Sequence, residues 1–206
     1  MLENENGLKI SVLVSGGGTN LQAVIDGIKE GVIPNAEIVR VISSSEKAYA
    51  LERAKSNHID GLVINKKNYT DSAQFNEALI QALDEVGTNL VVLAGYMKIL
   101  QPEVIQKYKG KIINIHPSLI PKYCGPGFYG HKVHEAVLLA NETESGATVH
   151  FVDEGVDTGE MIMQEKVEVR IDDTVDTLAA RVLQVEHKII QEAIIQYGKK
   201  LETGGN

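Results

Sequence analysis

The stretch ISVLVSGGGTNLQAVIDGIKE, residues 10–30, decides the fold. In it a β-branched run, Ile10–Val14, meets a glycine-rich turn and then apolar residues at helical spacing over Leu21–Glu30. The unit repeats along the first half of the chain, with strand-like runs at Ile38–Ile42, Leu62–Ile64, Leu90–Leu93 and Ile112–Ile115. This α/β pattern predicts a doubly wound, mostly parallel sheet with helices on both faces, because right-handed crossovers place helices on either side.

Helical spacing separates these runs and continues beyond them, at Lys47–Asn57, Asp71–Val86, Pro102–Tyr108, Val133–Ala140 and Thr174–Tyr197. Two later runs, Gly146–Val152 and Met161–Val169, predict an antiparallel addition to the sheet. The tail Leu201–Asn206 is expected to fray. We expect one domain over residues 1–206, with a Rossmann-like, phosphate-binding half at 8–115 and a second half at 116–206 that ends in a closing helix.

Composition excludes several classes of function. The 206 residues carry a formal net charge of -8, which argues against a sequence-independent grip on nucleic acid. The only cysteine is Cys124, so no intrachain disulfide can form. The N-terminal residues are polar and acidic, and no apolar run is long enough to span a membrane. We therefore expect a cytoplasmic protein without membrane contact.

The glycine turn Ser15–Asn20 favours a phosphate, because backbone N–H groups and a helix dipole converge there. A dinucleotide fits poorly, since Leu21 stands where the nicotinamide fingerprint has its third glycine and the second strand ends in Ser43–Ser45 instead of an acid. A nucleotide triphosphate loop also lacks its Gly-Lys-Ser/Thr ending. The alternative is a tight turn that binds nothing.

Two polar residues, Asn114 and His116, project on the same side of the fifth strand, because side chains alternate along a strand. An amide and an imidazolium side by side are suitable donors to an oxyanion on an attacked carbonyl. A carboxylate beside His116 would hold its tautomer and keep it protonated. Among Asp153, Glu154 and Asp157 we choose Asp157, although the sequence hardly separates the three.

Metal and thiol chemistry are not expected. His131 and His134 lack the further ligands of a zinc set and are predicted to be surface residues. Cys124 has no base beside it in the sequence, so a thiolate nucleophile is disfavoured.

Four motifs in order resemble the phosphoribosylglycinamide formyltransferases, a family of folate-dependent enzymes of purine biosynthesis. The motifs are VSGGGTNL at 14–21, VLAGYMKIL at 92–100, NIHPSLIPKY at 114–123 and HFVDEGVDTG at 150–159. The resemblance covers nearly the whole chain, and it implies the formyltransferase fold with a folate-binding second half.

The resemblance also implies roles for individual residues. It makes Asn114, His116 and Asp157 catalytic, assigns the substrate phosphate to Gly18, Thr19 and Asn20, and assigns a contact with the glycinamide substrate to Glu186. It implies a folate site made of Met97, Lys98, Ile99, Leu100, Asn114, Glu154 and Asp157. Many members have arginine where this chain has Lys98, and members often carry an arginine at the position of Ser72, for which Lys66 or Lys67 could substitute.

The implied reaction is attack by the amine of glycinamide ribonucleotide on the formyl carbon of 10-formyltetrahydrofolate, without a metal. Proton transfer would pass through His116 directly or through water ordered by Asp157. Formyltetrahydrofolate deformylase and methionyl-tRNA formyltransferase are related alternatives, but each has a further domain for which the chain offers no room. A silent folate or nucleotide binding module and a nicotinamide oxidoreductase are the alternatives from other classes. Monomer and homodimer are both compatible with the sequence.

Overall fold

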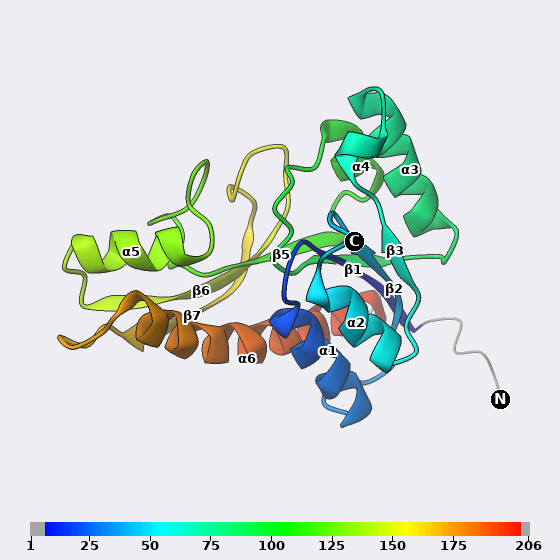
Figure 1. Ribbon diagram of the computed structural model, residues 1–206. Coiled ribbons are helices and arrows are strands. Elements are labelled where there is room, and N and C mark those ends of the chain that lie inside the picture. The colour runs from blue at the N-terminus through cyan, green and yellow to red at the C-terminus, as the bar shows by residue number, and fades with distance from the viewer. Residues whose placement is uncertain (1–6, 203–206) are drawn as a thin grey trace.

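The structure is a computed structural model that describes residues 7–202 (Figure 1). The expectations for residues 1–6 and for most of the tail, 203–206, lie outside this range. Within it, no helix combines the length and apolar character that a membrane crossing needs.

One seven-stranded sheet runs through the molecule in the order β3-β2-β1-β4-β5-β6-β7. Its strands are β1 (Leu8–Val14), β2 (Ala36–Ser43), β3 (Gly61–Val63), β4 (Leu90–Leu93), β5 (Ile112–His116), β6 (Glu144–Phe151) and β7 (Met161–Glu168). Pairing is parallel from β3 to β5 and antiparallel from β5 to β7. The doubly wound, mostly parallel sheet is thus confirmed. Strands β2 and β3 lie on one side of β1, and the later strands, beginning with β4, lie on its other side.

Over the described residues the chain has six α-helices and one short 3₁₀ helix, and all but the last α-helix lie between strands. They are α1 (Thr19–Lys29), α2 (Tyr49–Ser56), η1 (Lys66–Asn68), α3 (Ser72–Asp84), α4 (Pro102–Lys107), α5 (His131–Leu139) and α6 (Val175–Glu202). The predicted second helix began two residues too early, because Ala48 N–H donates to the Ser45 carbonyl in a turn before α2. The closing helix also continues beyond the predicted end at Tyr197.

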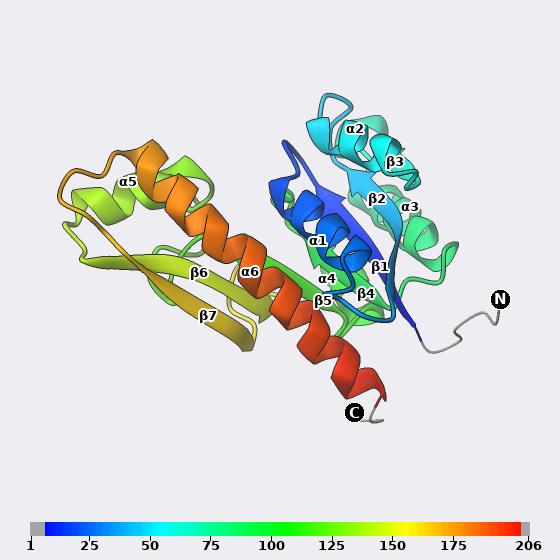
Figure 2. The ribbon, with the colours of Figure 1, turned by 90° about the horizontal axis from the view of Figure 1, so that it is seen from below.

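Helices cover the two faces of the sheet separately. On one face α1, α2 and α6 share a hydrophobic core with β1, and α1 lies alongside α6 (Figure 2). On the other face α3 and α4 share a second core with β4. The helices therefore leave the carboxyl ends of β1, β4 and β5 accessible, which is where ligands bind in sheets of this kind.

The pairing of β5 with β6 begins the antiparallel part of the sheet. Asn114 lies opposite His150, and His116 lies opposite Thr148. This change of direction falls at the expected division near residue 116, while the division into a phosphate-binding and a folate-binding half stays a prediction.

Candidate active site

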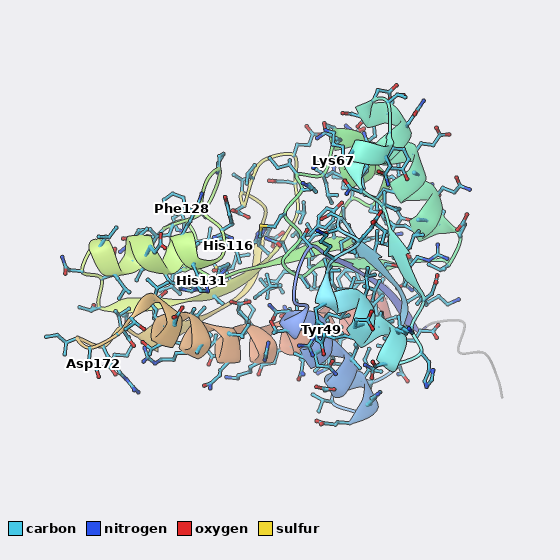
Figure 3. All side chains as sticks on the ribbon, in the orientation of Figure 1. Tyr49, Lys67, His116, Phe128, His131 and Asp172 are labelled. Carbon is cyan, nitrogen blue, oxygen red and sulfur yellow. The ribbon has the colours of Figure 1, made fainter. Side chains whose placement is uncertain are left out.

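A cavity of about 740 Å³ opens at the carboxyl ends of β4 and β5, and Asn20 of α1 also lines it. The connections after β4, β5 and β6 line it, together with the loop before α5 and one side of α6. Figure 3 labels three of its residues, His116, Phe128 and His131, which lie on the α5 side of the molecule. The cavity lies beyond the strand ends, where the sequence analysis expected polar groups to gather.

The carboxylate of Asp157 lies at the centre of a polar cluster in this cavity. Its Oδ1 accepts from Asn114 Nδ2 at 3.4 Å and lies 3.6 Å from His150 Nε2. Its Oδ2 accepts from the Gly125 backbone N–H at 2.9 Å and lies 3.6 Å from His116 Nδ1. The three residues expected to be catalytic are thus brought together, and His150 joins them.

Asp157 is held in its ionised form. Burial by itself would raise its pKa, but the hydrogen bond from His150, the charge of His116 and the Gly125 N–H together lower the pKa below its usual value. The residue also adopts a left-handed backbone conformation, with φ of 57°, which turns the 153–157 loop back toward β5. The other two acids of that loop point elsewhere: Asp153 accepts from Thr158, and Glu154 accepts from Gln106.

His116 is buried and has a neighbour at each ring nitrogen. Its Nε2 lies 2.9 Å from the Tyr123 carbonyl oxygen, and its Nδ1 faces Asp157. The carbonyl oxygen is an acceptor, so Nε2 carries the proton of that hydrogen bond. At 3.6 Å the carboxylate of Asp157 lies beyond hydrogen-bond distance of Nδ1, but it is close enough to stabilise positive charge on the ring.

His150 is a site residue that the sequence analysis did not assign. It shares one side of its strand with Thr148, but strand alternation alone does not say which residue of β5 lies opposite. The β5–β6 register places it beside Asn114, whose Nδ2 lies 3.2 Å from His150 Nε2. Its Nδ1 lies 2.7 Å from the carbonyl oxygen of Phe151 and donates to it, because a carbonyl oxygen only accepts.

The prediction that His134 is a surface residue is wrong. His134 is 3% exposed, and its Nδ1 has no hydrogen-bond partner among residues 7–202. Burial, followed by the nearby charges of His131 and His116, lowers its pKa to about 4. The side chain is buried because α5 packs against α6, whereas His131, at the start of the same helix, remains exposed.

The glycine turn reaches the cavity at Asn20, whereas Gly18 and Thr19 are not among the residues that line it. Gly18 caps α1 with a φ of 72°, and Thr19 is the first residue of that helix. The side chain of Asn20 donates from Nδ2 to Glu186 Oε2 at 2.6 Å, so these two expected substrate contacts are adjacent. Burial raises the pKa of Glu186, and the bond from Asn20 opposes that shift.

The segment expected to hold folate follows β4. The Met97 backbone N–H donates to Ser15 Oγ at 2.8 Å, which ties this segment to the glycine turn. Met97 and Ile99 are exposed at the cavity, whereas Leu100 is buried. Glu154 is not among the residues that line the cavity, and neither are Lys66 and Lys67; Figure 3 shows Lys67 well away from His116.

Cys124 does not line the cavity either, and its thiol donates to the Pro121 carbonyl. Burial and the charge of Asp157 raise its pKa, which disfavours a thiolate.

The protein combines an open α/β sheet, a glycine turn suited to an anion, and a cluster of amide, imidazole and carboxylate groups. Together these features define an enzyme that transfers a group at a carbonyl carbon.

Comparison with known proteins agrees with this class. Residues 8–194 match the model of the formyl transferase family. The chain is 44% identical over 181 residues to phosphoribosylglycinamide formyltransferase of Haemophilus influenzae, with 88% of this chain and 82% of the relative covered. It is 45% identical over 188 residues to the trifunctional purine biosynthetic protein adenosine-3 of Bos taurus, covering 90% of this chain and 18% of that protein.

A crystal structure of glycinamide ribonucleotide transformylase 1 from Symbiobacterium toebii superposes with a TM-score of 0.89 at 38% identity, covering 97% of this chain and 91% of that one. The chain belongs to the formyl transferase family. The resemblance inferred from the four motifs is thereby confirmed in both sequence and fold.

Proposed function

We propose that this protein transfers the formyl group of 10-formyltetrahydrofolate to the amine of 5-phosphoribosylglycinamide, a step of purine biosynthesis. The observation that carries the proposal is the convergence of Asn114, His116 and Asp157 on one wall of a cavity that Asn20 and Glu186 also line. The names of the relatives support the choice of substrates.

Asn114 would donate from its amide to the formyl oxygen as that oxygen gains negative charge. Its Nδ2 lies 3.2 Å from His150 Nε2 and 3.4 Å from Asp157 Oδ1, which holds the amide in the cluster before a substrate arrives. One of its two N–H groups would turn from these neighbours to the developing oxyanion, whose charge such a donor stabilises.

His116 and Asp157 would take part in transferring the proton that the attacking amine loses. In the balanced reaction the amine nitrogen forms a bond to the formyl carbon, the bond from that carbon to the folate nitrogen breaks, and one proton moves from the amine to the departing nitrogen. Asp157 would keep His116 charged, and the contact between them at 3.6 Å supports this pairing. The route, directly through His116 or through water, stays open.

The folate would lie along the segment 97–100 and the loop 153–157. The cavity volume suits a ligand of this size, and its lining there includes the apolar side chains of Leu93, Ile105 and Val152. The expected contact of Glu154 would then use its backbone, because its side chain is directed to Gln106. Lys98, Ile99 and Leu100 are placed along the same wall.

The phosphate would bind the N–H groups of Gly18, Thr19 and Asn20 at the start of α1. Glu186 would meet the glycinamide end. The proposed reaction uses no metal. The proposal includes a cytoplasmic location, and it is compatible with either a monomer or a homodimer.

The test mixes the purified protein with a 10-formyl folate in the presence and absence of glycinamide ribonucleotide, and follows the absorbance of the released folate. Release that requires the amine would support the transferase. Equal release in both samples would identify a hydrolytic deformylase instead, and no release in either would leave a binding module or another formyl acceptor.

A further inference from the structure

Arg53, on α2, makes a hydrogen bond to the glycine turn from outside the cavity. Its Nε donates to the Gly17 carbonyl at 2.8 Å, and its Nη1 donates to the Gln22 side-chain oxygen at 3.1 Å. Its guanidinium also lies over the ring of Tyr49, 5.1 Å from the centroid, and Figure 3 shows Tyr49 beside the first turn of α2. One side chain thus joins α2 to both the turn and the first turn of α1.

The backbone of α2 makes a second attachment to the same turn. Ala50 N–H donates to the Gly16 carbonyl at 3.1 Å. A Cβ built on Gly18 would lie 2.6 Å from Ala50 Cβ, so the two segments are in close contact. The carbonyl oxygens of Gly16 and Gly17 are therefore both occupied by donors from α2.

This arrangement decides which backbone groups an anion would meet. Carbonyl oxygens carry partial negative charge and would repel a phosphate, whereas free N–H groups attract it. With two carbonyls held by α2, the N–H groups that follow them are left for a ligand. The fixed charge of Arg53 also favours an anion nearby in a chain whose net charge is -8. The pKa of His187 on α6 is lowered, first by burial of the ring and second by this same charge.

We propose that Arg53 is a positioning residue for the substrate phosphate: it fixes the Gly17 carbonyl so that the N–H groups of the turn face the ligand. The inference rests on the proposed function for the identity of the substrate, and Arg53 itself need not touch that substrate. It concerns a residue of α2 that none of the four motifs contains.

The experiment measures binding of ribose 5-phosphate by calorimetry to the wild type, Arg53→Met, Arg53→Lys and, as matched control, Arg40→Met. Arg40 also donates to a backbone carbonyl and to side-chain oxygens, but its partners are Asp60 and α3. Loss of a charge-assisted contact predicts a Kd raised roughly tenfold or more in Arg53→Met. Arg53→Lys should recover part of this loss, because lysine can reach one oxygen but lacks the planar fork.

Kinetics supply the readout that a merely structural role would not give. The KM for glycinamide ribonucleotide should rise roughly tenfold in Arg53→Met while kcat and the KM for the formyl folate stay within about twofold. An unphosphorylated glycinamide riboside should be used equally well by wild type and variant. If Arg53→Met proves unstable, Arg53→Lys carries the same comparison.

Three outcomes would overturn the inference: unchanged ribose 5-phosphate affinity in Arg53→Met, no affinity in the wild type, or an equal loss for the phosphorylated and unphosphorylated substrates. The calorimetry contains no formyl donor. Ribose 5-phosphate binding that depends on Arg53, in a protein without formyl transfer, would therefore sustain this inference while refuting the proposed function.

Discussion

The two ends of the proposed site are built from different groups. At the glycine turn the groups proposed to face a ligand are backbone N–H groups at the start of α1, and the side chain of Arg53 holds the main chain there. At the other end, around Asp157, side chains from β5, β6 and the following loop approach one another. One end offers fixed dipoles, and the other offers groups that can exchange protons.

This difference matches what each end is proposed to do. A phosphate that is only held needs constant partners, and backbone amides provide them at any pH. A carbonyl that is attacked changes its charge during the reaction, so its partners must include groups that accept or give up protons. Substitutions should therefore separate the two ends, with turnover lost at one and substrate affinity lost at the other.

The largest effect is expected for Asp157→Asn. The amide keeps the shape of the side chain but removes the charge that faces His116, and a comparable change in a catalytic triad costs about 10⁴ in turnover. We expect kcat to fall roughly 10³–10⁴-fold in the formyl transfer assay. Asp172→Asn, a change at an exposed site before α6 that Figure 3 labels far from His116, is the control and should leave kcat unchanged. Equal kcat in both variants would contradict the role of Asp157.

Asn114→Ala should follow, with a loss in turnover of roughly 10²–10³ because one oxyanion donor is removed. Calorimetry should show that ribose 5-phosphate still binds with unchanged affinity. The control is Asn76→Ala, which removes another asparagine that donates to a side chain, Glu103, on the α3 face. Undiminished turnover in Asn114→Ala would remove the oxyanion role.

Gly18→Ala tests the opposite end. The added Cβ would meet Ala50 in a backbone with positive φ, so we expect a free energy of unfolding lowered by about 1–3 kcal/mol and weaker phosphate binding. Gly16→Ala is the matched control, because a Cβ there has no heavy atom within 4 Å. Denaturant titration and calorimetry measure the two quantities, and similar results for both variants would refute the packing argument.

Glu186→Gln should give the smallest effect, a gain in stability of about 1 kcal/mol near neutral pH. Because burial raises the pKa of Glu186, its stabilising contribution is present below the ordinary value of about 4.3 and is lost as pH rises through the folded-state pKa. The advantage of the glutamine variant should therefore grow from pH 4.5 to 7.5 in denaturant titrations. A constant difference would show that Glu186 keeps its ordinary pKa.

The backbone-built end was the easier one to predict from sequence. A glycine turn between a strand and a helix is local, so residues 10–30 were enough to place it. Local signals also separated the strands and helices, with errors of a few residues at their ends. The turn before α2 moved one of these ends, because its hydrogen bond from Ala48 to Ser45 leaves no pattern in the hydrophobic residues.

The side-chain-built end depended on distances that a sequence does not contain. His150 joins Asn114 only through the register of an antiparallel pair. His134 was misplaced because the spacing of apolar residues in a nine-residue helix does not reveal how closely α6 packs against it. The sequence analysis chose Asp157 among three acids that it hardly separated, and only the contacts of the Asp157 carboxylate with Asn114 and His116 distinguish it from the other two.

The antiparallel pairing of β5 with β6 determines where the coding sequence can accept insertions and deletions. Asn114 meets His150 through strand pairing, and the 27 positions from Pro117 to Thr143 that connect the strands do not set that alignment. Insertions or deletions in the connecting segment that spare Tyr123 and Gly125, the partners of His116 and Asp157, can lengthen or shorten the cavity wall while the cluster survives. A single inserted codon within β6 before His150 would instead turn its following side chains to the opposite face, so length variation among natural homologues should be concentrated in the connection and absent from the strand.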